Sequence, residues 1–368
     1  MRDNVLLLNE FLENGRLRLA GGALLSHAPG PMPPEFDFGR VEGMLLGLAI
    51  GDALGNTSEG RLPSERAASY GEIRDYLPNR HAGGRRVGVP SDDTQLAFWT
   101  LEQLIADRGF DPARVAERFS HGQIFGIGES VRTFLRNYKS GMPWYASGPE
   151  SAGNGALMRI APMLLPQLRT GSPGLWADAA LSGMITHNDS ASNAACVAFV
   201  NMLWQLLQMS RPPEPEWWLR AYVDAAKTLE TGQSYRPRGG QFTAYEGPLW
   251  RYTEERVGEA CRRNLSVVEA CNTWYSGAFL FEMLPSVITI LMQHGHHPEE
   301  AIVRAVNDTK DNDTVAAIVG AAVGALHGKA NLPERWVSGL LGRTTADDDG
   351  RIFELLAQAE QVFWLGET

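Results

Sequence analysis

The sequence predicts an all-α fold. Three observations support this: apolar residues recur at helical spacing in several long segments, alternating strand-like runs are nearly absent, and the composition is that of a globular chain, with 368 residues of which 44% are hydrophobic and 21% charged. No low-complexity segment divides the middle of the chain. We therefore expect one large domain, residues 37–368, preceded by an N-terminal extension, residues 1–36.

The extension combines a helical pattern with a proline-rich connector. Residues 4–19 place apolar and charged positions at roughly helical spacing, and the proline-rich stretch 27–34 then interrupts regular structure. We expect either a helix packed on the domain, a disordered tail, or an arm that binds a partner. Asp3, Glu10 and Glu13 interrupt the apolar core of a secretory signal, which predicts a cytoplasmic protein.

The domain itself contains five segments with helical patterns. They are 41–54, a helix from about 93 that includes 99–105, 196–209, 286–292 and 315–327. None approaches the ~20 apolar residues that a membrane-spanning helix requires. Between 211 and 265 the pattern weakens around several prolines, and there we expect a long functional loop.

The net charge and the cysteines exclude some function classes. A formal charge of -10 and a pI near 5.4 argue against nucleic-acid binding, which needs clustered Lys and Arg. The three cysteines, Cys196, Cys261 and Cys271, lack metal-ligand spacing, so we expect reduced thiols.

Two acidic clusters stand at the heads of apolar helices. They are residues 91–94, Ser-Asp-Asp-Thr, and residues 311–314, Asp-Asn-Asp-Thr. Each offers two carboxylates and a hydroxyl within one helical turn, and oxygen ligands suit Mg²⁺ or Mn²⁺ better than zinc. The alternative is helix capping, for which the same residue types are favoured. The second cluster lacks the central Gly and closing Glu of an EF-hand.

Further polar residues are candidates of two kinds. Asp52, between Gly51 and Gly55, is either a site residue or a buried, hydrogen-bonded aspartate, and Glu59 follows the helix where it could reach a site. The Gly-Asn-Gly sequence at 153–155 is a strong turn signal, and His187 is as compatible with capping the next helix as with ligand contact. Gly126 and Gly128 lack the third glycine of a dinucleotide-binding motif. Trp274 and Tyr275 could stack on a base or belong to the core.

As an ordered set these motifs resemble the ADP-ribosylglycohydrolase family. The set is Gly-Asp-Ala-Leu-Gly at 51–55 with Glu59, the cluster at 91–94, Gly-Asn-Gly-Ala-Leu-Met-Arg at 153–159, Thr-His at 186–187 and the cluster at 311–314. The match runs from about residue 41 to the C-terminus. The family includes the glycohydrolase that reactivates dinitrogenase reductase and the ADP-ribosyl-acceptor hydrolases.

The resemblance implies an orthogonal helical bundle with two Mg²⁺ or Mn²⁺ ions at the bottom of an ADP-ribose cleft. The residues that match the family's metal ligands are Ser91, Asp92, Asp93, Asp311, Asp313 and Thr314. Those that match its substrate-binding positions are Gly126, Gly128, Glu129, Ser130, Gly153, Asn154, Gly155 and His187. Ser91 stands where several members have Thr, and Gly126 where the members acting on dinitrogenase reductase have Asp.

The implied reaction is hydrolysis of an N-glycosidic bond of ribose. A carboxylate would act as general base on a water beside the anomeric carbon, and the candidates are Glu59 and Asp93. The resemblance favours arginine-linked ADP-ribose on a protein, with serine-linked ADP-ribose, O-acetyl-ADP-ribose or another nucleotide compound as alternatives. A non-catalytic binding protein or scaffold on the same fold is a further alternative.

Some bacterial relatives resemble immunity proteins against ADP-ribosyltransferase toxins. In that interpretation residues 1–36 form an arm that occludes the toxin, and hydrolysis is a second line of protection. The partners expected are thus an ADP-ribosylated protein and a cognate toxin, without nucleic acid or membrane.

Overall fold

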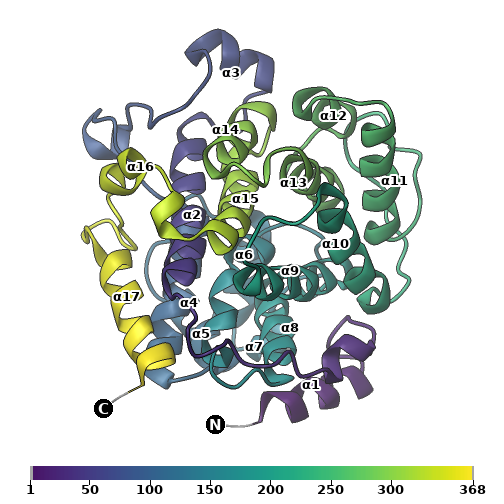
Figure 1. Cartoon of the computed structure of the whole chain (residues 1–368). Coiled ribbons are helices and arrows are strands. Elements are labelled where there is room, and N and C mark those ends of the chain that lie inside the picture. The colour runs from purple at the N-terminus through teal and green to yellow at the C-terminus, as the bar shows by residue number, and fades with distance from the viewer. Residues whose placement is uncertain (1–2, 367–368) are drawn as a thin grey trace.

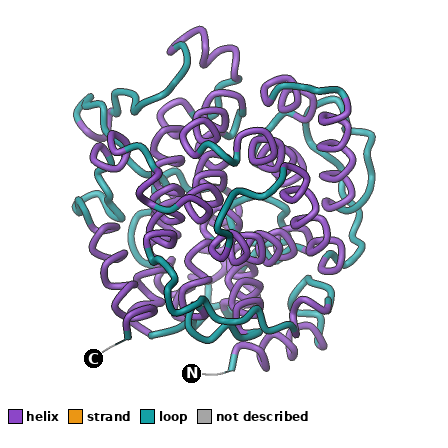
Figure 2. The backbone as a smooth tube through the Cα atoms, viewed as in Figure 1, coloured by secondary structure: helices purple, strands orange, loops and turns teal. Residues whose placement is uncertain are grey.

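A computed structural model describes residues 3–366, and these residues are almost entirely helices joined by loops (Figure 2). The only β pairing within this range consists of isolated bridges such as that between Gly153 and Phe279. The prediction of an all-α fold is therefore confirmed. Residues 1–2 of the expected N-terminal extension and residues 367–368 of the expected domain lie outside the described range. The α-helices are α1 (Asn4–Glu13), α2 (Gly39–Gly55), α3 (Pro63–Tyr70), α4 (Asp92–Asp107), α5 (Pro112–Ser120), α6 (Glu129–Lys139), α7 (Trp144–Ser147), α8 (Gly174–Thr186), α9 (Ser190–Gln208), α10 (Pro215–Leu229), α11 (Leu249–Arg262), α12 (Val267–Trp274), α13 (Leu280–His294), α14 (Pro298–Asp308), α15 (Asn312–His327), α16 (Glu334–Gly339) and α17 (Arg351–Glu360).

The helices α2 and α15 pack along each other through the middle of the molecule (Figure 1). Their contact is made by small residues, with Gly43, Gly47, Gly51 and Gly55 of α2 facing the backbone of α15. A methyl group on Gly43 would lie 2.6 Å from the carbonyl oxygen of Gly324, and one on Gly55 would collide with the backbone of Asp313. The glycines therefore allow the two backbones to approach so closely that the end of α2 meets the start of α15.

The remaining helices surround this central pair. The helices α16 and α17 lie on one side of it and α10 to α13 on the other (Figure 1). The helix α4 contacts α2 and packs against α5 and α17, while α9 packs against α8, α10 and α15. All five helices expected from apolar spacing are present, and each extends beyond the predicted segment at one end or both.

The stretch 211–265 contains a long loop, as expected, but it also contains two helices that were not predicted. This segment contains α10 and α11, and the irregular part is limited to the residues between Leu229 and Leu249. Pro215 is the first residue of α10. At this position the backbone N–H that proline lacks would have no partner within the helix, and the fixed φ of proline favours the helix. The prolines therefore mark a helix start here.

The N-terminal extension is packed against the domain. Leu7, Leu8 and Phe11 of α1 are buried, and Asn4 donates hydrogen bonds to the Phe110 carbonyl oxygen at 2.9 Å and to Asp178 Oδ1 at 2.6 Å. The proline-rich connector is held by its backbone, for example through Met32 N, which donates to the Leu168 carbonyl oxygen at 2.8 Å. The described part of the extension is thus ordered on the domain surface, as in the packed-helix alternative.

Within residues 3–366, no helix combines the length and apolarity needed to cross a bilayer. The three cysteines form no disulfide; Cys196 and Cys271 are buried and Cys261 is exposed.

Candidate metal centre and adjoining cleft

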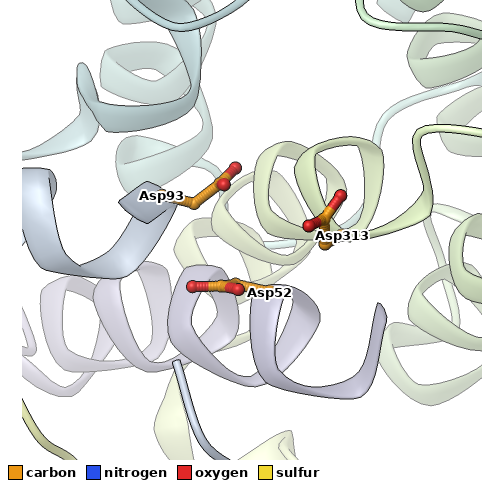
Figure 3. A group of neighbouring side chains, drawn as sticks. All are labelled: Asp52, Asp93 and Asp313. Atoms are coloured by element: carbon orange, nitrogen blue, oxygen red, sulfur yellow. The ribbon is translucent and has the colours of Figure 1, made fainter. Parts of the chain in front are cut away.

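Three helices bring three buried aspartates together near the middle of the molecule. Asp52 comes from the last turn of α2, Asp93 from the first turn of α4 and Asp313 from the first turn of α15. Carboxylate oxygens of all three lie within 4.8 Å of one another. Figure 3 shows Asp93 and Asp313 projecting into a common space beside Asp52. The acids at the two helix heads, which are far apart in the sequence, therefore converge.

A second acidic group adjoins the first. Carboxylate oxygens of Glu59, Asp311 and Asp313 also lie within 4.8 Å of one another. Asp313 belongs to both groups, so its two oxygens could serve two neighbouring cations. Asp311 is 9% exposed and Asp313 4% exposed, whereas Glu59 is an exposed residue.

Asp52 fixes the start of α4. Its carboxylate accepts hydrogen bonds from the Ser91 nitrogen at 2.9 Å, the Ser91 hydroxyl at 2.6 Å and the Thr94 hydroxyl at 2.5 Å. The Thr94 nitrogen also donates to it, at 3.1 Å. An aspartate of α2 thus takes the place of a local capping residue for α4. Asp52 is absent from the ligand set that the resemblance implied, because its role depends on a contact between helices distant in sequence.

The capping alternative for the two clusters is not supported. Ser91 and Asp311 occupy the N-cap positions of α4 and α15, and neither side chain makes a capping hydrogen bond. The other predicted ligands lie nearby. Thr314 is buried and its nitrogen donates to Asp313 Oδ1 at 2.8 Å, while Asp92 is 8% exposed and belongs to neither group of converging acids. Asp92 faces Gly126, where an added methyl group would lie 2.9 Å from Asp92 Oδ1.

Burial and mutual repulsion disfavour ionisation of these acids without a cation. Burial, followed by the charge of Asp52, raises the pKa of Asp93 well above its usual range, and burial followed by the charge of Glu59 does the same for the pKa of Asp313. Burial, with the charge of Glu59, raises the pKa of Asp311 to about 7. Although Glu59 is exposed as a residue, partial desolvation of its carboxyl group, followed by the charge of Asp52, raises its pKa.

The donor set fits a pair of hard divalent cations. Asp93 Oδ1 is buried without a hydrogen-bond partner. Within residues 3–366, no Lys or Arg side chain hydrogen-bonds to any of the five converging acids, which are Asp52, Glu59, Asp93, Asp311 and Asp313. Buried carboxylates are normally paired or bound to metal, and a set made only of oxygen atoms suits Mg²⁺, Mn²⁺ or Ca²⁺.

A buried arginine supports the second acidic group from behind. The Arg66 side chain is fully buried and donates to the carbonyl oxygens of Thr309 at 2.8 Å and Arg61 at 3.0 Å. Its Nε donates to the hydroxyl of Ser58 at 3.1 Å. Arg66 therefore joins the loop that carries Glu59 to the segment that leads into Asp311. No sequence motif indicated this residue.

The predicted glycine turn lies against the second acidic group. The Asn154 side chain donates to Asp311 Oδ2 at 2.5 Å, and the Asn154 nitrogen donates to the Ala278 carbonyl oxygen at 3.2 Å. Ser151 links this turn to the start of α6, because its hydroxyl accepts hydrogen bonds from the Ser130 hydroxyl at 2.9 Å and from the Gly153 nitrogen at 3.3 Å. Gly128 is the N-cap of α6 and Glu129 its first residue, and both are exposed.

His187 lies beside the turn and is 2% exposed. A methyl group on Gly155 would lie 2.8 Å from His187 Cε1, and Nδ1 lies 2.9 Å from the Thr186 hydroxyl. Burial, with the charge of Arg159, lowers the pKa of His187 to about 3, so the ring is neutral. Asp189, and not His187, caps α9, by accepting from the Ala191 nitrogen at 2.9 Å.

The two aromatic candidates, Trp274 and Tyr275, differ in burial. Trp274 is 1% exposed and its Nε1 donates to Ser286 at 2.8 Å, so it belongs to the core, whereas Tyr275 is 38% exposed.

A cleft of about 770 Å³ is lined in part by Glu59. It shares Glu59, Ser91 and Gly126 with the surroundings of the acids. Its other lining residues come from five chain segments and are Asn56, Thr57, Pro78, Asn79, Arg80, His81, Val89, Pro90, Gln123, Ile124, Phe125, Arg343 and Ala346. This volume is in the range of small-molecule sites.

Comparison with known proteins identifies the family of the chain. The family model described as ADP-ribosylglycohydrolase matches residues 33–363. The chain is 27% identical to "ADP-ribosylarginine hydrolase Tri1" of Pseudomonas putida over 83% of this chain and 75% of that protein. It is 26% identical to "ADP-ribosyl-[dinitrogen reductase] glycohydrolase" of Rhodospirillum rubrum over 87% of this chain and 96% of that protein. A solved structure titled "ADP-ribosylglycohydrolase-related protein complex" superposes with a TM-score of 0.65 at 26% identity, covering 89% of this chain and 97% of that one.

Proposed function

Because the chain belongs to the ADP-ribosylglycohydrolase family and is an ADP-ribosyl hydrolase, we propose that it cleaves the N-glycosidic bond between ADP-ribose and an arginine of a modified protein. The observation that carries the chemistry is the sharing of Asp313 by two groups of converging carboxylates. Two cations side by side are a frequent arrangement for orienting a substrate and a water in hydrolases.

The family is metal-dependent, and we propose two Mg²⁺ or Mn²⁺ ions as its cofactors here. Asp52, Asp93 and Asp313 would hold one ion, and Glu59 or Asp311 with Asp313 the other. Ser91, Asp92 and Thr314 stay in the proposal as further oxygen donors close to the acids. When bound, such ions supply positive charge that orients ribose hydroxyls and acidifies a water.

We assign the role of general base to Glu59. It is the one member of the second group that is exposed and also lines the cleft, whereas Asp93 is 2% exposed and faces the other aspartates. The raised pKa of Glu59 makes its carboxylate a stronger base than an ordinary glutamate. Glu59 would take a proton from the water that attacks the anomeric carbon, while the carbon–nitrogen bond breaks and the leaving guanidine nitrogen is protonated from solvent.

The substrate-binding assignments use backbone and neutral groups. The turn at 153–155, with Gly126, Gly128, Glu129 and Ser130, would bind the diphosphate and riboses through N–H groups at the start of α6. His187, neutral at physiological pH, would contact the substrate without adding charge. Asn154 would orient Asp311.

Arginine linkage is favoured over serine linkage or O-acetyl-ADP-ribose because the Pseudomonas putida relative is named for ADP-ribosylarginine. The test is release of ADP-ribose from a panel of arginine-linked, serine-linked and O-acetyl substrates in the presence of Mg²⁺. We expect release from the arginine-linked substrate, stopped by chelation, and a loss of about 10²-fold or more in kcat for Glu59→Gln. Release only from the other substrates would overturn the linkage, and unchanged kcat would remove Glu59 from the chemistry.

The role as an immunity protein is a narrower proposal. The packing of Leu7, Leu8 and Phe11 leaves Leu6, which is 66% exposed, as the apolar residue of α1 available to a toxin. If the chain binds a cognate ADP-ribosyltransferase and the Leu6→Glu variant does not, the result would support an extension that occludes the toxin. Undiminished binding would exclude α1 from that contact.

A further inference from the structure

The cleft beside Glu59 is lined by arginines that have no acidic partner. Arg80 donates from Nε to His81 Nε2 at 3.1 Å, and Arg343 has its Nε buried without any hydrogen bond. Within residues 3–366, no carboxylate lies within salt-bridge distance of either guanidinium, whereas Arg74, Arg304 and Arg335 each pair with acids on the surface. Both guanidinium groups can therefore bind an acidic group that enters the cleft.

The walls of the cleft are held in place by buried side chains. Gln95 of α4 is fully buried; it donates to the carbonyl oxygens of Gln123 at 2.9 Å and Thr344 at 2.8 Å, and accepts from the Phe125 nitrogen at 2.8 Å. Asp348 accepts from the nitrogen and the hydroxyl of Thr344, at 2.7 and 2.8 Å. The backbone next to Arg343 is therefore held in place by these hydrogen bonds.

The lining segment that carries Arg80 is fixed in the same way. Asn79 is 5% exposed, donates to the Thr57 hydroxyl at 3.2 Å and accepts from the His81 nitrogen at 2.8 Å. Arg80 begins the short helical turn that follows Asn79. The two guanidinium groups thus belong to a cleft whose shape is determined by buried hydrogen bonds.

The cleft and the glycine turn at 153–155 share no residue. Asn154 contacts Asp311, and the turn at 153–155 and His187 are absent from the cleft lining, which contains Glu59 and Ser91 instead. If ADP-ribose follows the turn, as the proposed function has it, the bond that breaks lies at the acids and the leaving side chain points towards the cleft. Gly126, which the cleft shares with the surroundings of the acids, then stays with the nucleotide, and the part of the cleft lined by Arg80 and Arg343 receives the protein.

We propose that this cleft binds an acidic side chain of the ADP-ribosylated protein, close in sequence to the modified residue. Guanidinium groups bind carboxylates by charge-assisted hydrogen bonds. The converging acids would repel a substrate carboxylate, and Arg80 and Arg343 offset this repulsion on the side where the protein enters. Asp347 and Asp349 lie on the same loop as Arg343 but outside the cleft lining. The inference rests on the proposed function and adds a sequence preference to it.

The test uses two ADP-ribosylated peptides that differ only in an Asp or an Asn flanking the modified arginine. We expect the Asp peptide to have a KM about fivefold lower at low salt, because an exposed ion pair contributes up to about 1 kcal/mol, and the preference to shrink in 0.5 M NaCl. In the double variant R80Q/R343Q the preference should disappear. The matched control is Arg86→Gln, on the same loop as Arg80 but outside the cleft lining.

Inhibition by free ADP-ribose distinguishes the nucleotide site from the part of the cleft that carries Arg80 and Arg343. We expect R80Q/R343Q to be inhibited by ADP-ribose as strongly as the parent chain. A large loss of this inhibition would place the diphosphate in the cleft and overturn the proposal, as would equal KM values for the two peptides in the parent chain. Absence of hydrolysis of both peptides by the parent chain would instead count against the proposed function.

Discussion

Asp52 at the end of α2 accepts hydrogen bonds from both the backbone nitrogen and the hydroxyl of Ser91, the residue that precedes α4. With Thr94 as a further donor, this contact sets the position of the first turn of α4, which carries Asp93. The start of α15, with Asp313, is held against the end of α2 at Gly55. The end of one helix thus positions the acidic first turns of two others.

Replacement of Asp52 by Asn should weaken metal binding without creating a cavity in the core. An asparagine keeps the size of the side chain, but its amide can no longer accept from Ser91 and Thr94 on both sides. We expect Mn²⁺ affinity, measured by calorimetry, to fall about tenfold or more. The control is Asp107→Asn at the other end of α4, where affinity should be retained; equal affinities for parent and D52N would contradict the role of Asp52.

Arg66 is predicted to position the second acidic group. Lysine keeps the charge but cannot supply the fixed set of donors that contacts Thr309, Arg61 and Ser58. Arg66→Lys should lower Mn²⁺ affinity about tenfold. Arg304→Lys, in a surface ion-pair network, serves as the control. If R66K lowers only the melting temperature and leaves the affinity unchanged, Arg66 has a structural role alone.

Gly55→Ala and Gly43→Ala form a matched pair along the α2–α15 contact. Both methyl groups would meet the backbone of α15 or the residues just after it, so each should cost about 1–3 kcal/mol of folding stability. Only the methyl group at Gly55 would displace Asp313. We therefore expect both variants to melt earlier and G55A alone to lose Mn²⁺ affinity; equal affinity losses would show that the acids depend on overall packing instead.

The stability of the protein should fall with rising pH because of Asp178, which anchors α1 through Asn4. Burial raises the pKa of Asp178 to about 7, above the value near 3.9 of an unfolded aspartate. The folded chain then binds more protons than the unfolded chain between about pH 4 and pH 7, so the free energy of unfolding decreases as pH rises through this window.

Asp178→Asn removes this titration and keeps a partner for Asn4. The decline in melting temperature from pH 5 to pH 8 should be smaller in the variant than in the parent chain. Glu230, whose pKa burial also raises to about 7, is present in both and cancels in the comparison. Identical slopes for the two proteins would show that Asp178 does not titrate in this range.

The sequence predicted the helices and the acidic first turns because both are local patterns. Apolar spacing located α2, α4 and α15, and the acid pairs at the starts of α4 and α15 were visible as short motifs. Helices α10 and α11 were missed because the prolines before Pro215 were interpreted as breakers, although proline at a first helical position is compatible with a helix.

The remaining site features depend on contacts between distant segments. The bonds from Ser91 to Asp52, the buried Arg66 and the unpaired Arg343 have no local signature. The N-terminal extension gave an ambiguous pattern, since burial of its apolar residues depends on α8, against which α1 packs, and on Trp144 and Tyr145 of α7, whose rings contact Phe11.

Anomalous diffraction from crystals grown with Mn²⁺ tests the metal centre most directly. We expect two anomalous peaks per chain, both within coordination distance of Asp313, with Asp52 or Asp93 beside one and Asp311 or Glu59 beside the other. A single peak away from Asp313, or none at saturating Mn²⁺, would contradict a centre built on that shared carboxylate.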